Sequence, residues 1–388
     1  MPAWTRSARE PTGSVASFRT MADIRRPALG LIVVGAAVGA LALAWKSPES
    51  EPAPHHPRRV SPVTESADAA RALERGRGRR ATAPWQIPWR GWMDIFWRAY
   101  SEVQEDRLLA VAAGVAFFAL LAFFPAVTAF VSLYGLFADA STIRDHLDLV
   151  ASFMPGGAFD ILREQVVRVV SKPSTTLGFA FIVSTGLVLW SANAGVKAII
   201  DALNVAYEET EKRSFIRLNL VSLCFTLGAF VALALALAAV VVFPLVLSAI
   251  GLSGWVETII WVLRWPALLA LVIFGLAVLY RFGASRREPQ WQWVSVGSIV
   301  AAVLWLAGSM LLSWYLQNFA DYNATYGSLG AGIGFLMWLW LSSIAVLLGA
   351  ELNAEIEHQT ARDSTVPPDK PLGARGARMA DTIGSAQT

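Results

Sequence analysis

Long apolar segments separated by short polar breaks fill the chain from about residue 108 to residue 352. A helix needs about 20 mostly apolar residues to cross the hydrocarbon core of a bilayer, and six of these segments are that long. Their bounds are about 108–137, 177–200, 218–250, 256–282, 291–319 and 329–352. The pattern predicts an all-α fold, a polytopic membrane bundle of six core transmembrane helices.

An amphipathic segment precedes the first of these helices, between residues 85 and 107. Its aromatic and charged side chains both recur at helical spacing: Trp89, Trp92, Phe96, Trp97, Tyr100, Arg90, Asp94, Arg98 and Glu102. Such a distribution is typical of a helix that lies in the plane of the membrane interface. We expect this helix to lead directly into the first spanning helix.

Polar segments flank the membrane domain, which we place at residues 85–358. Residues 1–27 and 359–388 lack hydrophobic periodicity and are predicted to be disordered. Residues 46–84 are rich in proline and arginine and are predicted to form a disordered linker. Residues 28–45 form a charge-free run of eighteen residues that predicts an extra N-terminal transmembrane helix. A helix that only associates with the membrane is the alternative, so the side on which residues 1–27 lie stays open.

Two features interrupt the regular succession of helices. The longest break, residues 138–176, contains two sets of apolar residues at helical spacing. We expect two short amphipathic helices on the outer membrane face, which form either a mobile lid or a fixed cover. Three prolines lie inside predicted spanning helices, and each should kink its helix because it removes a backbone hydrogen bond: Pro125, Pro244 and Pro266.

Composition agrees with a membrane protein. Only 16% of the 388 residues are charged, whereas a soluble domain has about a quarter. Sixteen tryptophans fit this class, because tryptophan favours the membrane–water interface. Arginine and lysine concentrate in residues 71–107, 201–217 and 281–287. By the positive-inside rule these segments are cytoplasmic, which places both flanks of the bundle there.

The basic balance of the chain has two interpretations. A net charge of +3 and the Arg-Gly run at residues 75–80 could indicate a nucleic-acid-binding tail. However, no aromatic residue interleaves this run, and its position before a membrane bundle favours attraction to anionic lipid headgroups. We therefore expect the lipid bilayer as a partner and no nucleic acid, and the oligomeric state stays open.

The residues that usually carry chemistry are sparse. Cys224 is the single cysteine, so the chain has no intrachain disulfide and no cysteine-based metal site. The four histidines show no metal-ligand spacing, and no Gly-x-x-x-x-Gly-Lys loop for ATP phosphates occurs. No group of His, Glu and Asp in a cytoplasmic loop supplies general acid–base catalysis. We therefore predict no enzymatic activity, no cofactor and no metal.

Charged and amide side chains gather at the predicted cytoplasmic ends of three helices. Buried charges of opposite sign should pair, because an isolated one costs several kcal/mol. We expect Glu351 to face Lys197 and Arg107. The group is either a clamp that fixes the helices or a gate and headgroup-binding site, and it comprises Asp106, Arg107, Lys197, Asp201, Glu351, Asn353 and Glu355.

A second candidate region lies at the predicted outer side, between the fifth and sixth helices. Tyr322, Asn323 and Tyr326 form either a tight turn with an interfacial aromatic anchor or a polar rim that binds an amphiphile. Arg264 lies about two turns inside the fourth helix. Its side chain either extends outward to the interface or faces a central cavity, where it could hold an anionic headgroup.

Several motifs resemble one bacterial family in order and in context. They are the run Asp106-Arg107 to Phe124-Pro125, Ser132-Leu-Tyr-Gly-Leu136, Trp190-Ser191, Tyr322-Asn-Ala-Thr-Tyr-Gly-Ser-Leu-Gly330 and Gly349-Ala-Glu-Leu-Asn-Ala-Glu355. These residues are similar to the signatures of the YihY / virulence factor BrkB family over about residues 88–360. The first eighty residues lie outside the resemblance, because most of the family lacks an apolar run like residues 28–45.

The resemblance implies a six-helix protein of the bacterial inner membrane. The family formerly carried the label ribonuclease BN and has been linked to envelope integrity and to movement of lipids or lipopolysaccharide precursors. We therefore expect a non-enzymatic transporter or translocase of a lipid-like envelope component. The alternatives are a scaffold for envelope assembly and a membrane-bound hydrolase or ribonuclease, as the old label suggested.

Overall fold

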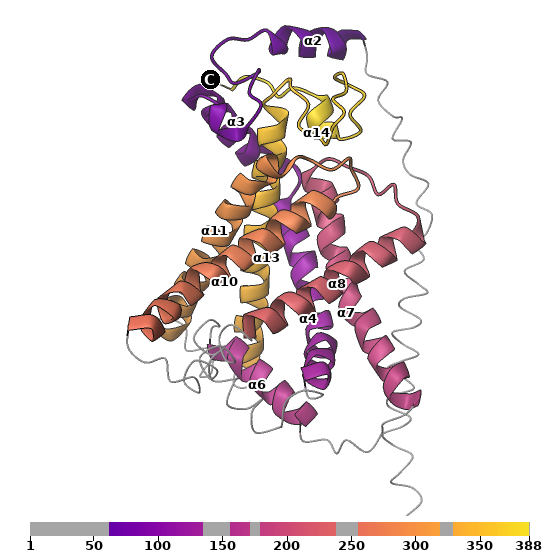
Figure 1. The fold of residues 1–388 in the computed structure, drawn as a ribbon, viewed down its shortest axis with the longest axis vertical. Coiled ribbons are helices and arrows are strands. Elements are labelled where there is room, and N and C mark those ends of the chain that lie inside the picture. The colour runs from indigo at the N-terminus through magenta and orange to yellow at the C-terminus, as the bar shows by residue number, and fades with distance from the viewer. Residues whose placement is uncertain (1–61, 135–155, 171–178, 238–254, 319–328, 388) are drawn as a thin grey trace, which may run out of the picture. The chain divides into compact units, whose positions relative to one another are not determined.

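The computed structural model describes residues 62–134, 156–170, 179–237, 255–318 and 329–387. Every regular element among them is helical: α2 (Pro62–Ala72), the 3-10 helix η1 (Pro84–Gln86), α3 (Trp89–Glu105), α4 (Leu108–Tyr134), α6 (Gly156–Val170), α7 (Phe179–Ala206), α8 (Phe215–Leu237), α10 (Trp255–Phe282), α11 (Trp291–Asn318), α13 (Leu329–His358) and α14 (Arg378–Asp381). Figure 1 shows these helices. The predicted segments 1–27 and 28–45 lie outside the described residues.

Each of the six predicted core helices coincides with a described helix. By length and composition, five helices in the described part of the chain could cross a membrane: Leu108–Thr128, Phe215–Ala236, Val262–Phe282, Trp291–Asn318 and Gly330–His358. The sixth position is that of α7, which carries Lys197 and Asp201. The prediction of a polytopic helical membrane bundle is confirmed.

A tight break separates the amphipathic helix α3 from the first spanning helix α4. The amide of Asp106 donates to the carbonyl of Glu102 and still continues α3. Arg107 then takes a positive φ of 49°, which turns the chain because a helix requires negative φ. The carbonyl of Arg107 accepts hydrogen bonds from the amides of Ala110 and Val111 and so begins α4.

The exposed and buried faces of α3 have different chemistry. Trp89, Phe96 and Tyr100 are exposed, as expected for aromatic side chains that contact a membrane interface. The opposite face buries Asp94 and Arg98 against the rest of the protein. Asp94 and Arg98, which the sequence pattern places at the membrane interface, are therefore buried inside the protein.

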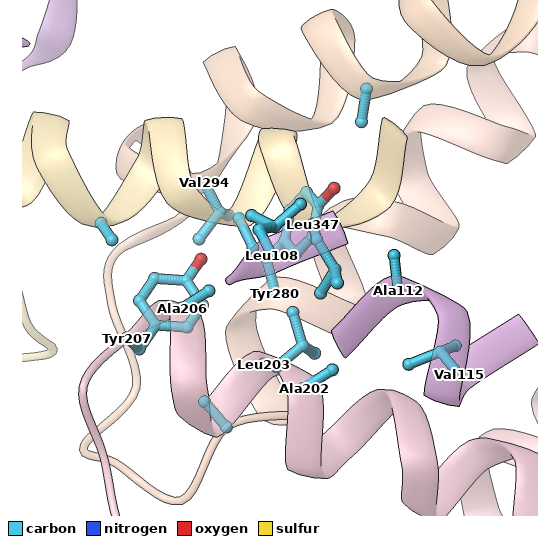
Figure 2. Packing of buried hydrophobic residues seen from close by; sticks show 14 of the residues in the cluster. Leu108, Ala112, Val115, Ala202, Leu203, Ala206, Tyr207, Tyr280, Val294 and Leu347 are labelled. Carbon is cyan, nitrogen blue, oxygen red and sulfur yellow. The ribbon is translucent and has the colours of Figure 1, made fainter. Parts of the chain in front are cut away.

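The central helix of the bundle is α13. It packs against α3, α4, α6, α7, α11 and α14, while α8 contacts α7 and α10 (Figure 1). One apolar core joins α4, α7, α10, α11 and α13, and Figure 2 shows its side chains, among them Leu108, Ala112, Val115, Ala202, Leu203, Tyr280, Val294 and Leu347. Packing against so many elements fixes the position of the C-terminal end of α13.

Two glycines allow α11 and α13 to approach closely. A Cβ added at Gly349 would lie 2.6 Å from the carbonyl oxygen of Gly297 and 2.5 Å from the Tyr280 hydroxyl oxygen. Backbone atoms cannot yield that space, so the helix crossing requires a residue without a side chain. The Tyr280 hydroxyl uses this contact to donate to the carbonyl of Val346 at 2.7 Å.

The features that interrupt the helices are described in part. Pro125 lies inside α4 and Pro266 inside α10, whereas Pro244 lies outside the described residues, and the kinks stay a prediction. Helix α6 occupies the place of the second amphipathic helix of loop 138–176 and packs against α4 and α13. The first of that pair lies outside the described residues.

The predicted end of the sixth helix is wrong, and so is the predicted disorder of residues 359–388 and of residues 62–84. Helix α13 continues past residue 352 to His358. Buried Arg375 donates to the carbonyls of Ala361 at 2.7 Å and Ala380 at 2.6 Å. Buried Arg79 donates to the carbonyls of Gln359 and Gly384. Arginine side chains that bind backbone carbonyls thus order these segments together with buried apolar residues such as Ala81, Met379 and Ile383.

Candidate functional site

The C-terminal end of α13 concentrates polar side chains inside the protein. Glu351, Asn353, Glu355 and Glu357 are each at most 1% exposed. A buried carboxylate costs several kcal/mol unless it is paired and hydrogen-bonded. The partner of each side chain therefore decides what the site can do.

Glu355 pairs with Arg98 of α3. The Arg98 guanidinium donates to the Glu355 carboxylate at 2.5 Å, and both side chains are almost fully buried. Arg98 also donates to the Gln359 side chain at 2.7 Å and to the carbonyl of Ser385 at 2.9 Å. This ion pair therefore joins α3, the end of α13 and the C-terminal tail.

Glu357 has a second buried arginine as its partner. Arg286 lies 2.9 Å from the Glu357 carboxylate, and its guanidinium stacks 3.8 Å from the centroid of the Tyr207 ring. The Ser364 hydroxyl donates to the same carboxylate at 3.0 Å. This pair connects the loop after α10 to α13 and to the end of α7.

Asn353 is a structural link between α13 and α11. Its side-chain oxygen accepts from the amide of Gly297 at 2.8 Å, and its side-chain nitrogen donates to the carbonyl of Val294 at 3.3 Å. Asn353 and Glu355 thus connect α13 to α11 and to α3, and the choice between a clamp and a gate stays a prediction.

Glu351 differs from its neighbours. In the described part of the chain, neither of its carboxyl oxygens has a hydrogen-bond partner. The expected pairing of Glu351 with Lys197 or Arg107 is wrong, because Lys197 binds elsewhere and Arg107 is exposed in the break between α3 and α4. An unpaired carboxyl group at the centre of the bundle end is the least expected feature of the site.

Two further acids at the end of α3 lie near Glu351 and contribute to its electrostatic surroundings. Burial, together with the charges of Glu355 and Glu105, raises the pKa of Glu102 to about 7. Burial and the charges of Glu208 and Glu105 raise the pKa of Asp106 to about 6. Both carboxyl groups therefore bind protons more tightly than they would in water.

Lys197 lies at a different place, on the border between α7 and α8. Its ammonium donates to the side-chain oxygen of Asn219 at 2.5 Å. It also lies 5.2 Å from the centroid of the Trp190 ring and 5.9 Å from that of Phe215. Both rings are exposed, at 55% and 71%, so the lysine lies behind an aromatic rim.

Further polar groups extend inward from Lys197 between the same two helices. Asn193 lies one turn from Lys197 on α7, and its side-chain oxygen accepts from the Thr226 hydroxyl at 3.4 Å. Asn193, Ser222 and Thr226 are buried. We call these residues the polar seam, which comprises Asn193, Lys197, Asn219, Ser222 and Thr226.

The last turns of α7 and the loop after it carry further charged groups beyond the polar seam. Asp201 lies one turn beyond Lys197, and its charge acts on the lysine. Burial alone would raise the pKa of Glu211, but hydrogen bonds from the side chain and backbone of Arg213 and from Asn204 lower it to about 2. The Glu211–Arg213 pair, at 2.7 Å, thus stays charged beside Asp201.

The predicted outer region is described only at Arg264. Tyr322, Asn323 and Tyr326 lie outside the described residues. Arg264 is half-buried, and its guanidinium carbon lies 5.0 Å from the centroid of the Trp265 ring. Within the described ranges, no three side chains of His, Cys, Asp or Glu come together as metal ligands.

The sequence did not reveal three important members of the site: Arg98, Arg286 and Glu357. Arg98 and Asp94 are four residues apart and thus share one face of α3, which was the available signal for Arg98. Arg286 lies in a loop with no periodicity, and its partner Glu357 follows the predicted end of the last helix. Only the fold brings these two together.

Comparison with known proteins places this arrangement in a family. A family model described as virulence factor BrkB matches residues 99–372. The match covers more than half of the chain and includes α4 to α13 with the carboxyl groups at the end of α13. The chain belongs to the virulence factor BrkB family. It is a multi-pass integral membrane protein.

Relatives of this BrkB-family protein occur in several bacteria. It is 31% identical to the ribonuclease-like protein YfkH of Bacillus subtilis over 251 residues, which is 63% of this chain and 88% of the relative. It is 29% identical to a UPF0761 membrane protein of Cronobacter sakazakii over 275 residues, 69% of this chain and 89% of the relative. A UPF0761 membrane protein of Neisseria meningitidis is 28% identical over 271 residues, 68% of this chain and 62% of the relative. No solved structure matches this chain.

Proposed function

We propose that this BrkB-family protein is a non-enzymatic translocase that moves a phospholipid-like amphiphile with an anionic headgroup across the bacterial inner membrane. Both flanks of its bundle are cytoplasmic in this proposal, because the loops at that end carry the excess of basic residues. The observation that carries the proposal is the polar seam between α7 and α8.

The polar seam provides what a headgroup needs inside a bilayer. From Asn219 to Thr226 it follows α8 for about 10 Å at 1.5 Å per residue. Polar side chains at this depth are costly unless they pair or face a polar substrate. Here they pair with one another or donate to backbone carbonyls of α8. A phosphate that entered from the side of Lys197 would exchange these contacts for its own.

The surroundings of the polar seam suit the apolar part of the same molecule. Ile216 and Leu220 on α8 are 79% and 61% exposed, so acyl chains can lie against α8 while the headgroup follows the seam. Trp190 and Phe215 form the rim, where aromatic side chains favour the interface. Lys197 behind that rim supplies the positive charge that selects an anionic headgroup.

Transbilayer movement in liposomes tests the proposal. The protein is reconstituted into vesicles of phosphatidylcholine and phosphatidylglycerol that carry a trace of headgroup-labelled phosphatidylglycerol. An impermeant reductant then quenches the outer leaflet. We expect quenching to continue into the inner-leaflet pool in vesicles with the protein, and to stop at the outer-leaflet fraction in empty vesicles.

A pair of lysine variants locates the path. Lys197→Gln should slow the movement by about tenfold or more, because hydrogen bonds to a charged group contribute about 1.5–3 kcal/mol and about 1.4 kcal/mol is a factor of ten in rate. Lys212→Gln is the matched control, because Lys212 is exposed and pairs only with Glu209 among the contacts described for it. Equal rates for both variants would contradict the role of the polar seam.

Two other outcomes would replace the proposal. No movement by well-folded protein, together with recovery of a specific partner protein by affinity purification from the membrane, would favour the scaffold. Degradation of RNA by protein freed of contaminating nucleases, abolished by a substitution in this chain, would favour the ribonuclease interpretation.

A further inference from the structure

Glu351 is the one described carboxyl group of α13 whose two oxygens are both buried without a hydrogen-bond partner. The residue is 1% exposed. Glu355 and Glu357, one and almost two turns further along the helix, each have a buried arginine. The chain therefore neutralises two of the three glutamates with arginine and leaves the third without a cation.

The charged groups around Glu351 make its ionised form still less favourable. Glu102 and Asp106 approach from the end of α3, Glu208 from the turn after α7, and Glu355 from α13 itself. All four are acids. The two buried arginines that pair with α13 do not reach Glu351, since Arg98 binds Glu355 and Arg286 binds Glu357.

A small hollow lies between α4, α7 and α13, next to Asp106 at the end of α3. Asp106, Leu108, Val111, Ala202, Val205, Ala206 and Leu347 line it, and its volume is about 10 Å³. Such a space holds about one water molecule. Leu347 precedes Glu351 by one helical turn on the same face of α13. Asp106 is half-buried and connects the hollow to the surface.

We propose that Glu351 is a proton-binding site, which holds a proton in this conformation and exchanges it through Asp106 and the adjoining hollow. On release, the Glu351 O–H bond breaks, the proton passes to a water molecule or to the Asp106 carboxylate, and Glu351 becomes negative. The negative form requires a cation or more water than the hollow can hold, because a carboxylate buried without a partner costs several kcal/mol. Proton release is thereby coupled to opening of the contact between α3, α7 and α13.

Reaction with a hydrophobic carbodiimide tests this site directly. The reagent modifies protonated carboxyl groups in apolar surroundings, and peptide mass spectrometry identifies the modified residue. For the full-length protein in nanodiscs at pH 7, we expect modification at Glu351 and its slowing as the pH rises. Glu355 and Glu357, paired with arginines, are internal controls that should stay unmodified.

Infrared difference spectra give a second measurement that does not depend on reagent access. The spectrum of the wild type minus that of Glu351→Gln should contain the band of a protonated carboxylic acid. A difference that contains only carboxylate bands at pH 7 would overturn the proposal. The same holds if the acid band is present but calcium or sodium ions remove it at constant pH, because the site would then bind a metal cation.

Thermal unfolding of the same variants separates a proton site from a structural charge. Glutamine resembles a protonated glutamate, so Glu351→Gln should unfold at the temperature of the wild type at pH 7. Glu355→Gln should unfold at a lower temperature, because it leaves Arg98 buried without its charge partner. Equal destabilisation by both substitutions would count against a neutral Glu351. These measurements do not require lipid movement, so their results do not depend on whether the protein is a translocase.

Discussion

Replacement of Arg98 by methionine tests how the cytoplasmic end of the bundle is held together. Methionine keeps an unbranched apolar chain of similar length and removes the guanidinium. The change leaves the Glu355 carboxylate, 1% exposed, without its arginine partner, so that His358 at 3.4 Å is the remaining ionisable partner described for it. It also removes the hydrogen bonds to the Gln359 side chain and to the Ser385 carbonyl.

The expected cost follows from burial. Removal of one member of a buried ion pair destabilises a protein by about 3–5 kcal/mol, since the other charge stays buried and unpaired. The shift in Tm per kcal/mol falls with chain length, and for 388 residues it is about 1.2 °C for each kcal/mol. We therefore expect Arg98→Met to lower the Tm by about 4–6 °C.

Thermal unfolding of detergent-solubilised protein, followed by tryptophan fluorescence, measures this change. Arg90→Met is the matched control, because Arg90 lies on the same helix and is exposed. Its Tm should equal that of the wild type. Limited proteolysis gives a second reading, because the C-terminal tail loses its bond from Arg98 to Ser385 and should be cleaved faster.

A double variant tests the physical reason itself. Arg98→Met combined with Glu355→Gln removes both charges, so it should be more stable than Arg98→Met alone. If Arg98→Met unfolds like Arg90→Met, the ion pair does not stabilise this end. If the double variant is no more stable than the single one, the cost does not come from an unpaired carboxylate.

Three further predictions concern other parts of the fold. Gly349→Ala should lower the Tm and the yield of folded protein, because its Cβ would clash with the carbonyl of Gly297, whereas Gly332→Ala should not, since its Cβ meets no described atom within 4 Å. Stability should fall as the pH rises from about 4.5 to about 7, because Glu102 binds its proton more tightly in the folded protein than in the unfolded chain. Glu102→Gln should weaken this dependence in unfolding scans at several pH values, and an unchanged dependence would exclude Glu102 as its source. Deletion of residues 383–388 should lower the Tm, because Ile383, Gly384 and Ser385 accept hydrogen bonds from arginines of the N-terminal half, and an unchanged Tm would show that the tail does not stabilise the bundle.

The spanning helices could be predicted because a single physical requirement defines them. A helix in hydrocarbon must be apolar over a fixed length, so the apolar runs give its position directly. The start of α4 at Leu108 was predicted correctly, since Asp106 and Arg107 mark the end of the apolar run. The end of α13 was not predicted correctly. Glu351, Asn353 and Glu355 resemble residues that leave the membrane for solvent, because the sequence does not show the groups beside which they are buried.

The partners of the charges could not be predicted for a related reason. Sequence shows which charges are buried within an apolar run, but their partners lie on helices whose rotation depends on packing. Arg98 was expected at the membrane interface with the aromatic residues of α3, yet α3 turns those residues outward and Arg98 inward. Lys197 was expected to meet Glu351, yet it faces α8 and binds Asn219.

The most direct test of headgroup binding in the polar seam is photo-cross-linking with a phosphatidylglycerol whose headgroup carries a photoreactive label. The protein is reconstituted in vesicles, illuminated and mapped by peptide mass spectrometry. The account predicts cross-links concentrated at residues 190–197 and 219–226, reduced by Lys197→Gln and unchanged by Lys212→Gln. Cross-links spread evenly over the exposed faces of α10 and α11, and insensitive to Lys197, would contradict it.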